Sequence, residues 1–150
     1  MMKATHTLSG AVMAQGYLAW MGLPMDPAYF TNPKALAFAF PAAAACLIGS
    51  TFPDIDIKLK IFGHRTVTHW FPPFLIAAFV SWLYFIPSIF LFCGAALLHI
   101  FLDAFTKMGV PILSPFGKRY GFCWVVTGGT SEILVVIALL SSGLGIWHFA

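Results

Sequence analysis

The chain has 150 residues, of which 60% are hydrophobic and only 9% are charged. A soluble domain has roughly a quarter of its residues charged and under half apolar, so this composition argues against a soluble globular protein. It also excludes disorder, which requires low hydrophobicity and high charge. The small net charge of +3 gives no case for a nucleic-acid partner. We expect a single domain, residues 1–150, whose surface is covered mainly by membrane lipids.

Five apolar segments are candidates for membrane-spanning helices, since a bilayer core requires about 20 mostly apolar residues per helix. The first is the weakest, because Gln15 and Gly16 interrupt it, but it has no convincing cleavage site and we expect it to stay in the mature protein. Pro87 separates the third segment from the fourth, because proline disfavours helix at the preceding residue. The sequence therefore predicts an all-α integral membrane bundle of about five helices, over residues 7–23, 35–52, 72–85, 88–104 and 132–149.

The basic residues fall almost entirely on one side of this five-span topology. That side includes the N-terminus and the loops after the second and fourth spans, whereas the other side holds only Lys34. Because basic residues in short loops favour the cytoplasm, we expect a multi-pass protein of the cell inner membrane with a cytoplasmic N-terminus. The residues on that side are Lys3, Lys58, Lys60, Arg65, Lys107, Lys118 and Arg119.

Most of the histidines and acidic residues fall at the same predicted membrane face as these basic residues. Ionisable groups at membrane depth are costly and usually mark functional sites, and His with Asp or Glu is a common ligand set for zinc. The chain therefore predicts a divalent-metal site at the cytoplasmic ends of the helices. The candidate residues are His6, Asp54, Asp56, His64, His69, His99, Asp103 and Glu132.

The spacing of these residues sets conditions on how they could meet. His99 and Asp103 are four residues apart and share one helix face, so they can hold the same ion. His64 and His69 are five apart and would diverge by about 140° on a regular helix, so they can meet only in an irregular segment. Taken singly, Asp54 could be a turn residue and Glu132 a helix-start residue that suits the helix dipole.

Cysteine does not contribute to the predicted metal site. The three cysteines lie far apart and form no CxxC pair, which argues against a disulfide framework or a thiolate site. We expect them to be small packing residues, at Cys46, Cys93 and Cys123.

The segment 106–130 is rich in glycine and proline and is still apolar in places. We expect it to form an interfacial loop or a short re-entrant hairpin that roofs the site. The pair Lys118 and Arg119 would then lie near anionic lipid headgroups.

An ordered set of motifs carries a resemblance to a known family. The motifs are His6, Pro53-Asp54-Ile55-Asp56, Gly63-His64-Arg65-Thr66-Val67-Thr68-His69, His99-Ile100-Phe101-Leu102-Asp103 and Leu113-Ser114-Pro115-Phe116. With them the chain resembles the LexA-regulated, membrane-bound metal-dependent hydrolases (the YdjM-like proteins). That family is distantly similar to the all-helical group of zinc-dependent phospholipase C and P1 nuclease.

The resemblance implies a ligand set for the metal. It assigns ligation to His6, to Asp56 or Asp54, to His69 or His64, and to the pair His99 and Asp103. The larger soluble enzymes carry further histidines and a glutamate on a later helix, whereas only Glu132 follows Asp103 on the same face here. One or two ions, most simply zinc, therefore fit better than three. Our expected ligands are His6, Asp56, His69, His99, Asp103 and Glu132.

The predicted function is a membrane-bound metal-dependent hydrolase. A bound metal lowers the pKa of water toward about 7, and the activated water would attack a phosphoester of a phospholipid or of a small soluble molecule. We expect Asp54 or His64 to act as general base or to orient a ligand, and Arg65 to clamp a phosphate. Two alternatives stay open, namely a divalent-metal carrier or sensor and a structural membrane protein whose metal staples the helices. The sequence leaves the oligomeric state open.

Overall fold

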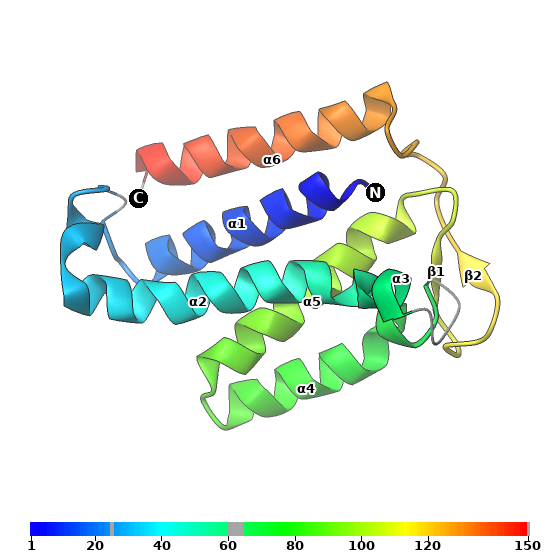
Figure 1. Ribbon diagram of the computed structural model, residues 1–150, viewed down its shortest axis with the longest axis horizontal. Helices are drawn as coiled ribbons and strands as arrows, with labels where there is room; N and C mark the ends of the chain where they lie inside the picture. The colour runs from blue at the N-terminus through cyan, green and yellow to red at the C-terminus, as the bar shows by residue number, and fades with distance from the viewer. Residues whose placement is uncertain (25, 60–64, 150) are drawn as a thin grey trace.

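The computed structural model of the chain describes residues 1–24, 26–59 and 65–149. Within these residues, the main elements are long helices that run roughly side by side along the long axis of the molecule (Figure 1). The predicted all-α membrane bundle is therefore confirmed. The long helices are α1 (Lys3–Trp20), α2 (Pro33–Thr51), α4 (Phe71–Leu83), α5 (Pro87–Ala104) and α6 (Thr130–Phe149).

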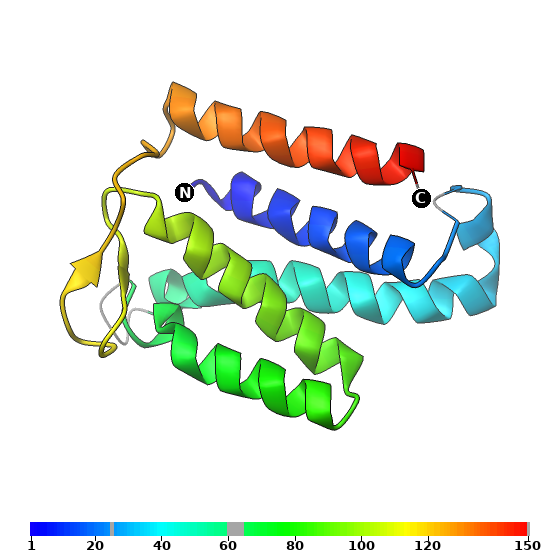
Figure 2. The same ribbon diagram turned by 180° about the vertical axis from the view of Figure 1, so that it is seen from behind.

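Short elements complete the fold. Single 3-10 turns are η1 (Tyr29–Thr31), η2 (Phe52–Asp54) and η3 (Val67–His69), and α3 (Ile55–Leu59) follows η2 directly. The two-residue strands β1 (Val110–Pro111) and β2 (Arg119–Tyr120) pair antiparallel. The N-terminus, α3, both strands and the start of α6 all lie at one end of the bundle, in both views (Figures 1 and 2). We call this the site end.

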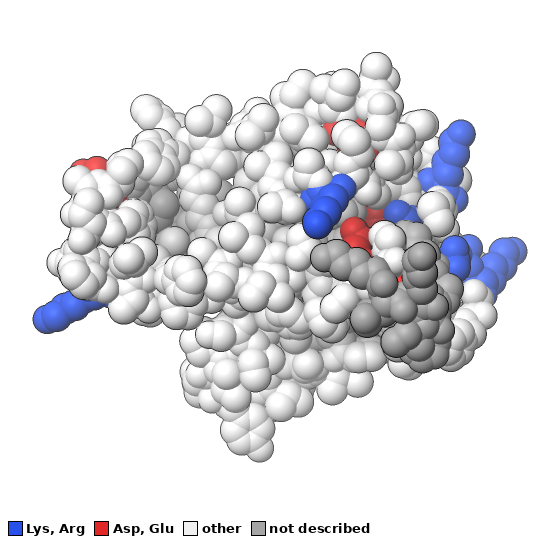
Figure 3. Space-filling view, in the orientation of Figure 1, with Lys and Arg blue, Asp and Glu red and all other residues white. Residues whose placement is uncertain are grey.

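Three stretches among the described residues are long and apolar enough to cross a membrane, namely Pro33–Ile57, Pro87–Ala104 and Thr130–Phe149. The first predicted span corresponds to α1, which does not meet that condition. The third corresponds to α4, which is apolar but has only 13 residues, or about 20 Å of helix. Charged atoms are sparse over the middle of the molecule, and basic atoms gather toward the site end (Figure 3).

Glycines let the helices approach closely beside the site. A Cβ added at Gly49 of α2 would overlap the backbone carbonyl of Phe92 in α5. A Cβ added at Gly10 of α1 would lie 2.8 Å from the carbonyl oxygen of Cys46 in α2. Small residues of this kind permit close contact between membrane helices, where apolar burial gives little driving force. They hold α1, α2 and α5 together where the candidate side chains lie.

Gly49→Ala is expected to destabilise the protein by about 1–3 kcal/mol, because the new methyl group has no space against the α5 backbone. Thermal unfolding of the detergent-purified protein measures the effect. Gly145→Ala is the matched control, since a Cβ at Gly145 meets nothing within 4 Å. Equal unfolding temperatures for the two variants would show that the contact between α2 and α5 is looser than described.

Gln15, which interrupts the first predicted span, has a defined partner. Its amide Nε2 donates to the carbonyl oxygen of Gly143 in α6 at 3.0 Å. A polar side chain in a membrane helix is stabilised when it bonds to a neighbouring helix in this way. The bond helps to fix α6 along α1, with which it runs side by side (Figures 1 and 2).

The segment 106–130 forms a hairpin-like structure against the end of α5. The backbone N–H of Phe122 donates to Ala104 at 2.8 Å, and that of Val125 donates to Phe105 at 3.0 Å. Gly109 has a φ of +61° and lies against the backbone of Tyr120, which only glycine permits without strain. The segment is therefore built onto the site end, as the sequence predicted for a loop near the site.

Candidate metal centre

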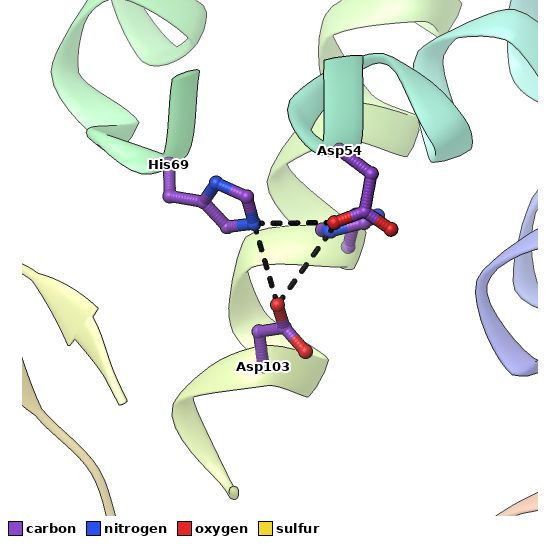
Figure 4. A group of neighbouring side chains, drawn as sticks. Asp54, His69 and Asp103 are labelled. Carbon is purple, nitrogen blue, oxygen red and sulfur yellow. Dashed lines mark ion pairs between the residues drawn. The ribbon is translucent and has the colours of Figure 1, made fainter. Parts of the chain in front are cut away.

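Four side chains from three segments converge at the site end. Asp54 comes from η2, His69 from η3, and His99 and Asp103 from successive turns of α5. One donor atom from each lies within 4.8 Å of all the others. Figure 4 shows His69 pointing its ring toward the carboxylates of Asp54 and Asp103. We call these four residues the metal cluster.

The spacing of the donor atoms fits a small divalent ion. His69 Nε2 lies 3.7 Å from Asp54 Oδ1 and 3.3 Å from Asp103 Oδ2. His99 Nε2 lies 3.6 Å from each of the same two oxygens. A tetrahedral ion with bonds of about 2.0–2.2 Å requires neighbouring donors about 3.3–3.6 Å apart. The four nitrogen–oxygen distances therefore match the donor spacing of a zinc site.

The hydrogen bond of His99 fixes which nitrogen faces the metal cluster. Its Nδ1 lies 2.6 Å from the carbonyl oxygen of Ser50, and a carbonyl can only accept, so Nδ1 carries the proton. In the neutral ring, Nε2 then holds a lone pair, and among the described residues it makes no hydrogen bond. A buried imidazole nitrogen directed at two carboxylates without a hydrogen bond is what a metal ligand requires.

His69 is held from behind by polar groups. Its Nδ1 lies 3.2 Å from the Thr68 hydroxyl and 3.6 Å from Asp56 Oδ2. That same Asp56 oxygen accepts from the Thr68 hydroxyl at 2.9 Å and from the backbone N–H of Arg65 at 2.8 Å. Burial lowers the pKa of His69, against the opposing effect of Asp103, and so favours the neutral ring that binds metals. Asp56 thus lies behind His69, on the side away from the metal cluster.

Asp103 lies at the centre of the polar interior. Its Oδ2 faces the metal cluster, while Oδ1 lies 3.3 Å from His6 Nε2 and 2.6 Å from the amino group of Met1. The His6 ring stacks on His99 with centroids 3.6 Å apart. His6 is buried, and neither of its ring nitrogens makes a hydrogen bond among the described residues. One carboxylate oxygen of Asp103 therefore faces the other donors of the metal cluster, and the second oxygen faces His6.

The buried guanidinium of Arg65, which the sequence predicts to clamp a phosphate, contacts Asp103. Its Nη2 lies 2.8 Å from Asp103 Oδ2, and its Nη1 donates to the Thr106 hydroxyl at 2.7 Å and to the Gly109 carbonyl at 3.1 Å. The backbone at Arg65 has a φ of +58°, which is rare for a residue with a side chain. Such strain persists where the surroundings enforce it, and here the buried guanidinium joins α5 to the hairpin segment.

Glu132 lies apart from the metal cluster, although it is fully buried. Its Oε1 accepts from the backbone N–H of Met2 at 2.6 Å and from the Thr5 hydroxyl at 2.7 Å. Its Oε2 accepts from the backbone N–H of Gly128 at 2.7 Å. Three donors occupy the carboxylate, and these hydrogen bonds join the start of α6 to the start of α1.

The structure therefore brings together only part of the set named from the sequence. His69, His99 and Asp103 meet in the metal cluster together with Asp54, for which the sequence predicts a catalytic or ligand-orienting role. His6 lies beside them, Asp56 and Glu132 lie outside, and His64 falls outside the described residues. Sequence reasoning missed Ser50, Thr68 and Thr106. Ser50 acts through its backbone carbonyl, and a backbone contact leaves no signal in residue type.

Comparison with known proteins places the chain in a family. The family model of the YdjM inner membrane proteins matches residues 1–149. The chain belongs to the YdjM inner membrane protein family. Like the other members, it is thus a membrane protein, in agreement with the three stretches among the described residues that are long and apolar enough to cross a membrane.

Two relatives of this YdjM-family chain come from Bacillus subtilis (strain 168). It is 31% identical to the uncharacterized protein YfhP over 96% of its own length, but spans only 45% of that relative. It is 32% identical to the uncharacterized protein YvsG, over 90% of this chain and 87% of the relative. No solved structure was found to match the chain.

Proposed function

We propose that this YdjM-family chain is a membrane-embedded, metal-dependent hydrolase that acts on phosphoesters. The observation that carries the proposal is the convergence of two imidazole nitrogens on two carboxylate oxygens. Each nitrogen lies 3.3–3.7 Å from each oxygen. Oxygen and nitrogen donors are the usual ligands of hydrolytic zinc sites, whereas structural zinc sites mostly use cysteine. The resemblance to metal-dependent hydrolases described above supports the same reaction class.

The proposed roles follow from the position of each side chain. His69 and His99 would hold the ion through Nε2, and Asp103 would hold it through Oδ2 while Arg65 keeps that carboxylate in place. Asp54 has 20% of its side chain exposed and can therefore meet water. We propose that it accepts a proton from the attacking water. A bound divalent cation would supply Lewis acidity, which polarises a phosphoryl oxygen and lowers the pKa of nearby water.

His6 extends this arrangement toward a second ion. It faces the Asp103 oxygen that the metal cluster does not use, and that oxygen also lies 2.6 Å from the Met1 amino group, which a second ion would have to displace. One ion satisfies the three proposed ligands His69, His99 and Asp103, and His6 supports at most one more. We therefore propose one or two zinc ions per chain.

The basic residues support a cytoplasmic location for the metal cluster. Arg65 and Lys107 belong to loops of the site end and Arg119 to β2, whereas Lys34 lies at the start of α2, at the opposite end of the bundle (Figure 1). By the preference of basic loops for the cytoplasm, we propose that the site end and the N-terminus face that side.

A structural staple is the second candidate function. The four donors come from η2, η3 and α5, and a tetrahedral ion bound by all four would have a closed coordination shell. Closed shells are typical of structural zinc, whereas catalytic zinc keeps an open position. The partial exposure of Asp54 favours catalysis, because this carboxylate can exchange its place with water.

The proposal predicts hydrolysis of bis(p-nitrophenyl) phosphate that depends on both metal and Asp54. The detergent-purified chain is stripped with a chelator, reloaded with zinc or manganese, and assayed. We expect activity only after reloading, and a loss of at least about 100-fold in Asp54→Asn, as is usual for removal of a proton acceptor. Asp26→Asn, at an exposed aspartate far from the metal cluster, is the control. Stoichiometric metal without turnover on phosphoesters, combined with a lowered unfolding temperature on stripping, would instead support the staple.

A further inference from the structure

A groove of about 370 Å³ lies directly beside the metal cluster. It runs between the start of α1 and the segment where α2 continues into η2 and α3. Its lining includes Lys3, Ile48, Thr51, Phe52, Asp54 and Ile57. Figure 3 shows acidic atoms reaching the surface beside basic atoms on this face of the molecule.

Asp54 connects the groove with the metal cluster. It lines the groove and is partly exposed. By contrast, His69, His99 and Asp103 each have at most 1% of their surface exposed. Among the described residues, the metal cluster is therefore reached from outside past Asp54. A molecule bound in the groove would place its reactive group against that carboxylate.

The walls of the groove are mainly apolar and exposed. Ile48 is 58% exposed and Ile57 is 53% exposed, and both belong to the apolar stretch Pro33–Ile57 that can cross a membrane. If this stretch crosses the membrane, the groove opens toward the lipid. The one basic side chain in its described lining, Lys3, is exposed at its edge. Hydrocarbon walls, a cation and an adjoining metal cluster together match an anionic amphiphile.

We propose that the groove binds a membrane phospholipid, with its acyl chain along Ile48, Phe52 and Ile57 and its phosphate between Lys3 and Asp54. The chemical step rests on the proposed function. In it, the water oxygen forms a new bond to phosphorus, and the bond from phosphorus to the leaving alcohol oxygen breaks. One water proton passes through Asp54 to the leaving alcohol, and the other stays on the phosphate product.

The test compares a lipid with a soluble phosphoester in the full-length chain reconstituted in nanodiscs. Ile48→Trp fills the groove, and Leu47→Trp, one residue away and outside the described lining, is the matched control. We expect Ile48→Trp to slow hydrolysis of phosphatidylglycerol by at least about tenfold, as is typical when apolar contacts in a pocket are disturbed. Hydrolysis of bis(p-nitrophenyl) phosphate should fall by a clearly smaller factor, because the soluble diester needs the opening at Asp54 but not the apolar wall. Leu47→Trp should resemble wild type on both substrates.

A binding measurement separates the lipid proposal from the hydrolase proposal. Phosphatidylglycerol with a photoactivatable acyl chain should label Ile48, Phe52 or Ile57 in wild type and in Leu47→Trp, but not in Ile48→Trp. Lys3→Gln should weaken the labelling, whereas Lys34→Gln at the opposite end should not. Labelling without hydrolysis of any phosphoester would keep the lipid groove and overturn the hydrolase. Hydrolysis of the soluble diester without labelling, or equal loss on both substrates in Ile48→Trp, would overturn the lipid groove.

Discussion

Asp103→Asn is expected to abolish metal binding, with the metal content falling from at least one ion per chain to near zero. The substitution keeps the shape of the side chain but removes the negative charge that faces His69, His99 and Arg65. Changes in groups that merely support metal ligands already cost about 10–100-fold in affinity, so loss of a ligand should cost more. Elemental analysis of the detergent-purified protein, after dialysis against zinc, measures the ratio of ion to chain.

His99→Ala tests the same site independently, because it removes the Nε2 donor and leaves Asp103 intact. We expect the same loss of metal. His148→Ala is the control, since His148 lies in the last turn of α6 at the opposite end of the bundle. Thermal unfolding of each apo variant confirms that it is folded. Unchanged metal content in both Asp103→Asn and His99→Ala would remove these residues from the site and, with them, the hydrolase proposal.

The bundle was largely predictable from composition and apolar runs. A chain with 9% charged residues must place its apolar side chains against lipid, and proline at position 87 marks the break between α4 and α5. The bounds of α4 were also predictable, since the expected span 72–85 nearly matches Phe71–Leu83. The residues before Phe71 belong to η3 and to the loop that presents His69.

The pair His99 and Asp103 was predictable because both residues lie on one continuous helix, where a spacing of four fixes a shared face. Asp54 and Asp56 were not distinguishable in this way. They lie two residues apart at the junction of η2 and α3, so their side chains point about 200° apart on helical geometry. One faces His69 Nε2 and the other His69 Nδ1. Which is which depends on the approach of η3, and the sequence does not encode that locally.

The role of Glu132 could not be predicted from the sequence, because its position at a helix start suited two interpretations equally well. An acidic residue in the first turn complements the helix dipole, and an acidic residue at the site end could also bind metal. The structure gives the carboxylate three hydrogen bonds from other segments. These long-range partners were not visible in the sequence, since Thr5 and Gly128 carry no motif that pairs them with position 132.

Glu132→Gln should therefore destabilise the bundle by about 3 kcal/mol while leaving the metal content unchanged. The amide can still accept at one oxygen, but its NH2 group would face a donor that now lacks an acceptor, and an unsatisfied buried donor is costly. Thr5→Ala removes a single donor from the same carboxylate and should cost about 1 kcal/mol. Thermal unfolding and elemental analysis of the two variants measure both effects. If Glu132→Gln instead lost its metal as fully as Asp103→Asn and unfolded at the wild-type temperature, Glu132 would be a ligand rather than the bond between α1 and α6.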